Sequence, residues 1–221
     1  MKKYKGIIFD LDGTLLDTIE DLTDSVNDVM EEYHFPKHDT KACKMMVGNG
    51  FQKLIKRALP EEKQKDEDFV LEALNKFAKA YHQRYLNKTV PYDGIKELFD
   101  QLEEKKIKVA VNSNKRSDYT EALVKKFFEG YPMVAVYGER EREGIPKKPD
   151  PAAALEIAKQ MNLSVEEVLY IGDSKTDMQT GQNAGMDTIG VSWGFRGPKE
   201  LRDNKATYIV EKPEDILTYV I

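Results

Sequence analysis

A short apolar stretch near the amino terminus ends in two carboxylates, and this combination constrains the fold and the chemistry more than any other feature. Residues 7–9 (Ile-Ile-Phe) precede Asp10, Leu11, Asp12 and Gly13. An apolar run of this length, bounded by turn-forming residues, is typical of a buried strand. Side chains two residues apart point the same way in extended backbone, so Asp10 and Asp12 are expected to face one point. Two such carboxylates repel each other unless a proton, a cation or a lysine lies between them.

The composition favours a folded protein in a reducing aqueous compartment. The 221 residues allow one large domain or a domain with a sizeable insertion, and 40% hydrophobic residues can fill a core. Cys43, the only cysteine, has no partner for an internal disulfide. No stretch approaches the roughly 18 consecutive apolar residues of a membrane span. Asp10 and Asp12 also interrupt the apolar segment that a signal peptide needs, so we expect a cytoplasmic protein without a membrane partner.

The net charge argues against nucleic acid as a partner. The chain has 34 basic and 39 acidic residues, which gives a net charge of −5. Domains that bind nucleic acid usually carry a clustered basic face. We therefore expect no nucleic-acid partner, whereas a local basic pocket for a small anion is compatible with this balance.

The region 17–87 has a helical pattern. Its apolar residues recur at helical spacing in one-sided stripes, and no strand-like alternation interrupts them. The stripes comprise Leu22, Val26, Val29, Met30 and Tyr33; Phe51, Leu54, Ile55, Ala58 and Leu59; and Val70, Leu74, Phe77, Tyr81 and Tyr85. We expect a helical cap domain at 17–87, inserted into a core formed by 1–16 and 88–221, with chain crossings at 17–18 and 90–91.

Beyond residue 90, short apolar runs alternate with helical patterns. The expected strands are 107–111, 134–137, 168–171 and 188–191, and the expected helices begin near 95, 119, 151 and 178. Such alternation indicates a parallel sheet covered on both faces. The predicted fold class is therefore α/β, with a Rossmann-like parallel sheet core and an inserted small α-helical cap. Asp93 and Asp150 are expected to cap the helices that follow them.

Polar residues also follow the predicted strand 107–111. In open parallel sheets, ligands bind beyond the carboxyl ends of the strands, and Ser113 and Asn114 fall at such an end. A hydroxyl there could hydrogen-bond an oxyanion, together with backbone amides of the turn. Taken alone, however, a Ser/Asn cluster is more often ordinary turn chemistry.

Lys148 occupies a stiff position between a loop and a helix. Pro149 favours an extended conformation at Lys148, and Asp150 with Pro151 suits a helix start. An ammonium group fixed in this way could neutralise a carboxylate or phosphate oxygen, although most lysines are simply solvated.

A further acidic pair follows the apolar run 168–171. Asp173 lies directly after this predicted strand, where a ligand at the strand end would bind. Asp177 has two interpretations, since it also fits a capping box with Ser174.

Together these positions predict a site for phosphoryl transfer assisted by a metal ion. Asp10, Asp12 and Asp173 offer the hard oxygen ligands that Mg²⁺ prefers. Ser113, Lys148 and the backbone amides after Asp10 offer what a phosphate group needs. Weak signals that converge on one sheet edge support one another.

The motifs resemble those of the haloacid dehalogenase-like hydrolase superfamily. Residues 10–14 (Asp-Leu-Asp-Gly-Thr) are similar to its first motif, Ser113 to the second, Lys148 to the third, and 172–174 with Asp177 to the fourth. They occur in the family's order and span nearly the whole chain. Within the superfamily, the segments that resemble phosphoglycolate phosphatases are 10–18, 47–59 and 190–194.

The resemblance implies a nucleophile and an acid–base residue. Asp10 would attack phosphorus and form an aspartyl-phosphate, and Asp12 would protonate the leaving group and then deprotonate water. Mg²⁺ would be held by Asp10, Asp173 and the backbone carbonyl of Asp12. The second acid, Asp12, favours phosphate over halide chemistry, because the dehalogenases of this superfamily lack it.

The resemblance also implies residues that bind the phosphate group. Ser113 and Lys148 would hold phosphoryl oxygens, and Asp177 would support Lys148 or metal-bound water. The further expected substrate contacts in the core are Gly13, Thr14 and Asn114.

Specificity is expected to lie in the cap. Gly48, Asn49 and Gly50 precede the helical stripe that starts at Phe51, and free amides at a helix start bind anions. This loop could therefore contact a substrate carboxylate, or it could be a plain turn. Arg57 is interpreted as an exposed cap residue, and the alternating charges of 139–143 as a solvated loop.

We therefore expect a Mg²⁺-dependent phosphatase for a small phosphorylated metabolite, with 2-phosphoglycolate as the best single candidate. The alternatives are a sugar-phosphate mutase, a pyrophosphatase or a broad-specificity phosphatase on the same scaffold. A non-catalytic phospho-sensing protein would need neither the cap nor the second acid. The expected assembly is a monomer or a homodimer.

Overall fold

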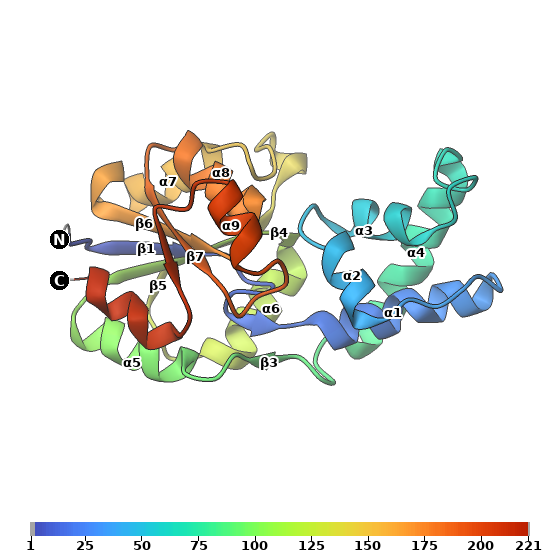
Figure 1. The fold of residues 1–221 in the computed structure, drawn as a ribbon, viewed down its shortest axis with the longest axis horizontal. Coiled ribbons are helices and arrows are strands. Elements are labelled where there is room, and N and C mark those ends of the chain that lie inside the picture. Colours follow the sequence, from blue (N-terminus) through green and yellow to red (C-terminus); the bar gives the residue numbers. More distant parts are fainter. Residues whose placement is uncertain (1–2, 221) are drawn as a thin grey trace.

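A six-stranded sheet forms the centre of the protein, as the computed structural model of residues 3–220 shows (Figure 1). Its strands are β1 (Gly6–Phe9), β4 (Lys108–Arg116), β5 (Met133–Glu139), β6 (Val168–Gly172), β7 (Asp187–Val191) and β8 (Tyr208–Val210). They run parallel in the order β5-β4-β1-β6-β7-β8. The predicted parallel α/β core is confirmed, and β1 lies near its middle.

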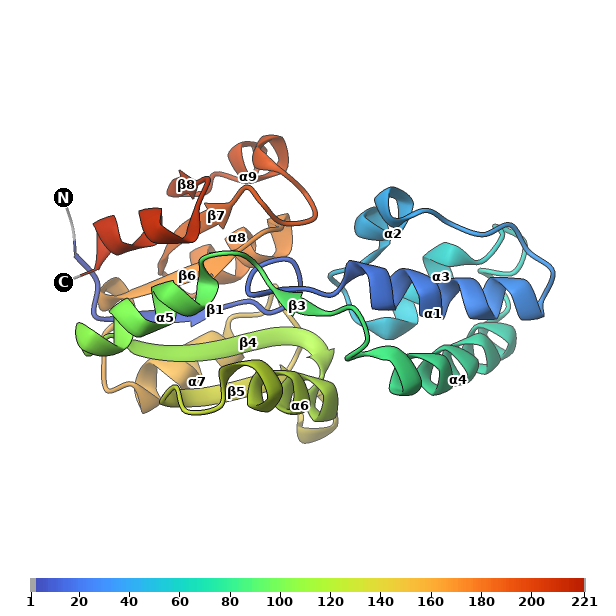
Figure 2. The same cartoon turned by 90° about the horizontal axis from the view of Figure 1, so that it is seen from below.

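Helices cover both faces of this sheet (Figure 2). The alternation within β1 shows why, since Ile7 and Phe9 enter one core cluster and Ile8 enters another. The first face is covered by α5 (Ile95–Glu104), α6 (Ser117–Phe128) and the 3₁₀ helix η3 (Pro213–Tyr219). The second face is covered by α7 (Ala152–Gln160), α8 (Lys175–Asn183) and α9 (Pro198–Asp203). Short 3₁₀ turns complete the connections, η1 (Glu141–Glu143) and η2 (Val165–Glu167).

A separate group of helices, called here the helical lobe, lies beyond the carboxyl edge of the sheet (Figure 1). It comprises α1 (Ile19–Glu32), α2 (Thr40–Met46), α3 (Phe51–Ala58) and α4 (Glu67–Arg84). The lobe has its own apolar cluster, which contains most of the predicted stripe residues. Tyr119 and Phe195, from elements of the sheet region, also pack into this cluster. The lobe therefore rests on the edge where the predicted site residues converge.

The two chain crossings between the sheet region and the lobe lie side by side. β2 (Leu16–Asp17) and β3 (Val90–Pro91) form a short antiparallel ladder. Next to it, the buried carboxylate of Asp21 accepts hydrogen bonds from the Lys88 and Thr89 amides and from the Thr89 hydroxyl, the last at 2.8 Å. The start of α1 is thus fastened to the returning strand.

Strand β4 is longer than the sequence predicted. It continues to Arg116, with an irregular register against β5 after Asn112. Ser113 and Asn114 therefore lie in the bulged end of a strand, and the alternative of an ordinary turn is wrong. The extension arises because Arg116 still pairs with Glu139 of β5.

Helix α5 starts where predicted, and the starts of α6, α7 and α8 differ from the predictions by one to three residues. Helix α8 begins at Lys175, because Ser174 and Asp177 form the expected capping box. Asp93 does not cap α5, since the capping position is Gly94 with φ of 83°. Pro151, not Asp150, occupies the cap of α7, but the Asp150 carboxylate still accepts the Ala152 amide at 2.9 Å. Within residues 3–220, no helix is long and apolar enough to cross a membrane.

We predict that Asp21→Ala lowers the free energy of unfolding by about 3 kcal/mol, because it leaves buried amide and hydroxyl donors of residues 88–89 without an acceptor. Urea unfolding monitored by circular dichroism measures this change. The control is Asp24→Ala, whose carboxylate pairs with Lys88 at the surface and should contribute less than about 1 kcal/mol. Equal losses in the two variants would contradict the anchoring role of Asp21.

Candidate active site

Asp10 lies directly after β1, and its carboxylate contacts a buried lysine. The Nζ atom of Lys148 donates to Asp10 Oδ1 at 2.7 Å and to Asp177 Oδ1 at 2.7 Å. The Lys148 side chain is only 4% exposed. The backbone amide of Lys148 donates to Asn114 Oδ1 at 2.9 Å, which fixes this loop against the end of β4. The predicted fixed ammonium is therefore present, and it faces two carboxylates.

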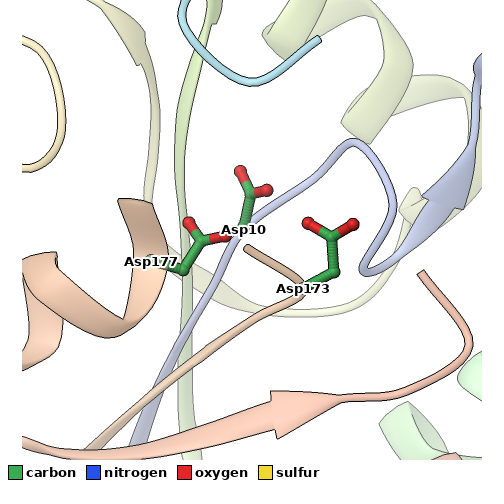
Figure 3. Close-up of side chains that lie close together, drawn as sticks. All are labelled: Asp10, Asp173 and Asp177. Atoms are coloured by element: carbon green, nitrogen blue, oxygen red, sulfur yellow. The ribbon is translucent and has the colours of Figure 1, made fainter. Parts of the chain in front are cut away.

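Three carboxylates lie close together here, from the ends of β1 and β6 and from the first turn of α8. Oxygen atoms of Asp10, Asp173 and Asp177 lie within 4.8 Å of one another (Figure 3). Asp173 Oδ2 accepts the Phe195 amide at 2.6 Å, and Asp177 Oδ2 accepts the amide and hydroxyl of Ser174. Each carboxylate is thus oriented by its own partners.

The crowding of these carboxylates changes their acidity. Burial, together with the negative charge of Asp177, raises the pKa of Asp10 to about 7 although Lys148 opposes the change. Burial and the charges of Asp177 and Asp10 also raise the pKa of Asp173 well above its ordinary value. Lys148 contacts two of these three acids, Asp10 and Asp177, so the group has a surplus of negative charge over this lysine when ionised.

Asp12 lies apart from this group and has its own lysine. Its carboxylate accepts hydrogen bonds from Lys115 Nζ at 2.9 Å and from the Thr18 hydroxyl at 2.6 Å. The Lys115 side chain is 1% exposed, and its ammonium lies over the Tyr81 and Phe51 rings, 4.9 and 5.5 Å from their centroids. Burial alone would lower the pKa of Lys115, but the facing Asp12 carboxylate raises it above its ordinary value.

A small cavity of about 40 Å³ lies between these residues and the helical lobe. The predicted residues that line it are Asp10, Asp12, Asp173, Ser113, Lys148, Asn114, Gly48 and Gly50. Asn114 also joins three segments, because its Nδ2 donates to the carbonyl oxygens of Gly48 and Lys148 at 3.0 and 3.2 Å. The structure therefore brings most of the predicted residues to one place.

Four predicted residues do not line the cavity. Gly13 and Thr14 donate their amides within the turn, to Leu16 and Leu11. A Cβ at Gly13 would lie 2.5 Å from Asp173 Oδ2, so glycine allows this backbone to approach the carboxylate closely. Asn49 accepts from Arg57 at 2.8 Å in a neighbouring pocket. Asp177 contacts Lys148 Nζ at 2.7 Å, so it lies behind this lysine and outside the cavity lining.

Sequence reasoning missed Lys115, Phe195 and Arg196, all of which line the cavity. Lys115 directly follows Asn114 in a polar run at a strand end, and this position could have indicated that it belongs to the site. Phe195 and Arg196 lie between β7 and α9, where only the three-dimensional fold brings them beside Asp173.

The carboxylate group fits a divalent cation. Buried carboxylates in surplus over cations are stable only with protons or with a metal ion, and their oxygens are ligands that Mg²⁺ accepts. The Asp10, Asp173 and Asp177 side chains satisfy this condition. The Asp12 carboxylate lies outside the group, so any part of Asp12 in metal binding rests on its backbone carbonyl, as the resemblance implied.

A parallel sheet with acids and a lysine at its carboxyl edge, facing a helical lobe, agrees with the arrangement that the sequence resemblance implies. Residues 7–191 match the sequence model of the haloacid dehalogenase-like hydrolases. The chain belongs to this family.

Several relatives are similar over nearly the whole chain. A phosphoglycolate phosphatase from Psychrobacter arcticus is 30% identical, with 97% of this chain and 95% of that protein covered. One from Pasteurella multocida is 29% identical, with 99% of each covered. A crystal structure from Lactobacillus delbrueckii subsp. bulgaricus, whose assignment as a phosphoglycolate phosphatase is itself provisional, has a TM-score of 0.89 and 33% identity over 97% of each chain.

We predict that Mg²⁺ stabilises the protein more at pH 7.5 than at pH 5.5. Without metal, the folded Asp10 carboxyl keeps its proton up to about pH 7, whereas the unfolded one loses it near 3.8. The folded state then binds more protons between these values, so stability falls as the pH rises. A metal ion removes this penalty and should raise Tm by roughly 5–10 °C at 100 times its Kd.

The matched variants for this experiment are Asp173→Asn and Asp203→Asn. Asp173→Asn should lose most of the Mg²⁺-dependent shift in Tm, and the exposed Asp203→Asn on α9 should retain it. An equal shift at both pH values, or in both variants, would show that the cation binds elsewhere.

Proposed function

We propose that the protein is a Mg²⁺-dependent phosphatase that hydrolyses a small phosphate monoester, with 2-phosphoglycolate as the first candidate. The observation that carries this proposal is the contact of Lys148 with Asp10 in a buried group of carboxylates that borders a small cavity. The relatives named phosphoglycolate phosphatase over nearly the full chain support the substrate.

In the first step, a carboxylate oxygen of Asp10 forms a bond to phosphorus while the bond from phosphorus to the ester oxygen breaks. Lys148 lies 2.7 Å from Asp10 Oδ1 and holds this side chain in place. Its ammonium and the Ser113 hydroxyl, which also lines the cavity, would hold the phosphoryl oxygens. The covalent aspartyl-phosphate divides a very slow hydrolysis into two easier steps.

Asp12 would move the protons in both steps. Its carboxyl gives a proton to the departing alcohol, and the resulting carboxylate accepts one from the water that attacks phosphorus. In this second step the bond between phosphorus and the Asp10 oxygen breaks, which frees inorganic phosphate and restores the Asp10 carboxylate. Lys115 and Thr18 hold the Asp12 carboxylate by hydrogen bonds, so the proton carrier and the nucleophile have different partners.

Asp10, Asp173 and the Asp12 carbonyl would hold Mg²⁺, and Asp177 would act through Lys148. The ion would supply positive charge for the transferring group. The negative surplus of the carboxylate group supports a cation at this place, and its identity as Mg²⁺ is part of the proposal.

We also propose that residues 17–87 form a cap domain over a core of 3–16 and 88–220; residues 1–2 and 221, also assigned to the core, lie outside the described residues. The separate apolar cluster of the lobe and the paired crossings β2 and β3 support this division. Phe51, Leu54 and Gly48 of the lobe line the cavity, so the cap would shield the reaction from water. A cytoplasmic location and a monomeric or homodimeric state stay predictions.

We expect phosphate release from 2-phosphoglycolate that is lost with a chelator and restored by Mg²⁺. The assay compares it with hexose phosphates, nucleoside monophosphates and pyrophosphate. Broad, weak release would favour a phosphatase of low specificity, and a clear preference for pyrophosphate would favour a pyrophosphatase. Release that needs an activating bisphosphate would favour a mutase. No release from any ester would contradict the proposal and favour a sensing protein.

Asp10→Asn should lower turnover at least about 10³-fold, because an amide is a poor nucleophile. Lys148 keeps its contact with Asp177 in this variant, so the fold should survive, which circular dichroism checks. The control Asp203→Asn should retain wild-type turnover. Substantial turnover by folded Asp10→Asn would show that another group attacks phosphorus.

A further inference from the structure

A second pocket of about 180 Å³ lies beside the catalytic cavity, between the helical lobe and the sheet region. The two spaces share Val47, Gly48, Ser174 and Arg196 in their walls. Arg57 of α3 lines the pocket from the lobe, and Lys175 of α8 lines it from the sheet region. A small molecule bound at Asp10 could therefore extend toward this pocket past Arg196.

The pocket has more positive than negative charge. Arg57, Arg196 and Lys175 line it with a single acid, Glu200. Glu200 Oε1 lies 3.9 Å from Arg196 Nε and accepts instead the backbone amide of Lys175 at 2.9 Å. Among residues 3–220, no carboxylate lies within 4 Å of the Arg57 guanidinium. Arg57 therefore has no ion-pair partner among these residues, and Arg196 has a long contact with Glu200 at 3.9 Å.

Each arginine is held in place by neutral acceptors of the lobe. Arg57 donates to the Met46 carbonyl at 2.7 Å and to Asn49 Oδ1 at 2.8 Å. Arg196 donates to the Val47 carbonyl at 2.6 Å, and its side chain is 11% exposed. Burial and the nearby charge of Arg196 both lower the pKa of Arg57, in agreement with this close approach. Such preorganised guanidinium groups retain N–H donors for a ligand.

Arg196 is also tied to the catalytic carboxylates. It follows Phe195, whose amide donates to Asp173 Oδ2 at 2.6 Å. Its positive charge opposes the rise in the pKa of Asp173, so the guanidinium lies within electrostatic range of that acid. A ligand group at Arg196 would therefore lie near the phosphate held by Asp10 and Lys148.

We propose that Arg196 and Arg57 bind a second anionic group of the substrate, a carboxylate or a second phosphate, on the leaving-group side of the ester. The proposal rests on the phosphatase function above and names the feature by which that site selects its substrate. A guanidinium presents parallel N–H groups that match the oxygens of a carboxylate or phosphate. The surplus positive charge of the pocket attracts such an anionic group, whereas a neutral tail gains no such attraction.

Binding of two phosphonates that cannot be hydrolysed tests this proposal. 3-Phosphonopropionate resembles 2-phosphoglycolate with carbon in place of the ester oxygen, and 3-hydroxypropylphosphonate has a neutral tail. Calorimetry with the Mg²⁺-loaded full chain should show about ten- to hundredfold tighter binding of the anionic probe. Propane-1,3-bisphosphonate, as a third probe, shows whether a carboxylate or a second phosphate is preferred.

Arg196→Gln should reduce this preference to near unity, and Arg57→Gln should reduce it in part. The control is Arg202→Gln on α9, which removes the same charge from an exposed position nearby and should keep the preference. Arg196 could instead serve only to hold the lobe against the sheet region through the Val47 carbonyl. In that case Arg196→Gln would weaken both probes equally.

Equal binding of the two probes by the wild type, equal weakening in Arg196→Gln, or no binding of either probe would overturn the proposal. These outcomes are separate from the phosphatase function, because the probes report binding without turnover. If the protein releases phosphate but shows no preference that depends on the arginines, the phosphatase function stands and the anion subsite is refuted. If it releases no phosphate but keeps the preference, the anion subsite stands and the phosphatase function is refuted.

Discussion

The contact of one lysine with two carboxylates is the interaction on which the rest of the site depends. Lys148 Nζ lies 2.7 Å from both Asp10 and Asp177, and all three side chains are buried. Removing one partner from a buried charged pair commonly costs about 3–5 kcal/mol, because the remaining charge is left without compensation. The end of β1, the first turn of α8 and the loop that carries Lys148 must therefore keep fixed positions.

Two lysines divide the acids of the site into two sets with different surroundings. Lys148 lies in the group of Asp10, Asp173 and Asp177, whose negative charges outnumber this one lysine. Such a group suits a nucleophile beside a metal ion. Lys115, at the bulged end of β4, forms an ion pair with Asp12, and its ammonium lies over aromatic rings of the lobe. Two nearby aspartates can then do different chemistry, because each has its own partners. The helical lobe contributes to this arrangement directly, through Phe51 and Tyr81.

Much of the core was predictable because its signals are local. The run 7–9 followed by Asp10 indicates a buried strand with acids at its end, and Ser174 with Asp177 shows a helix start within four residues. The alternating pattern after residue 90 gave the parallel sheet, and the one-sided stripes gave the lobe. Strand limits were less certain, since β4 continues past Val111 only because it pairs with β5.

The site residues that were not predicted from the sequence depend on contacts between distant segments. Nothing in the local sequence shows that Lys115 faces Asp12, 103 positions away. Arg196 and Arg57 approach each other only when the β7–α9 connection meets α3. At Gly13 the absence of a side chain leaves room for Asp173, which only the fold shows, and its expected contact with substrate stays a prediction.

Asp10 is proposed to carry the phosphoryl group, and trapping that group on the protein tests this role most directly. Mg²⁺-loaded enzyme is mixed with ³²P-labelled 2-phosphoglycolate, quenched in acid within one turnover and digested into peptides. We predict label on the peptide that contains Asp10, and none in Asp10→Asn. Label on another peptide, or rapid turnover with no label on the protein at any time, would contradict the assignment of Asp10 as the nucleophile.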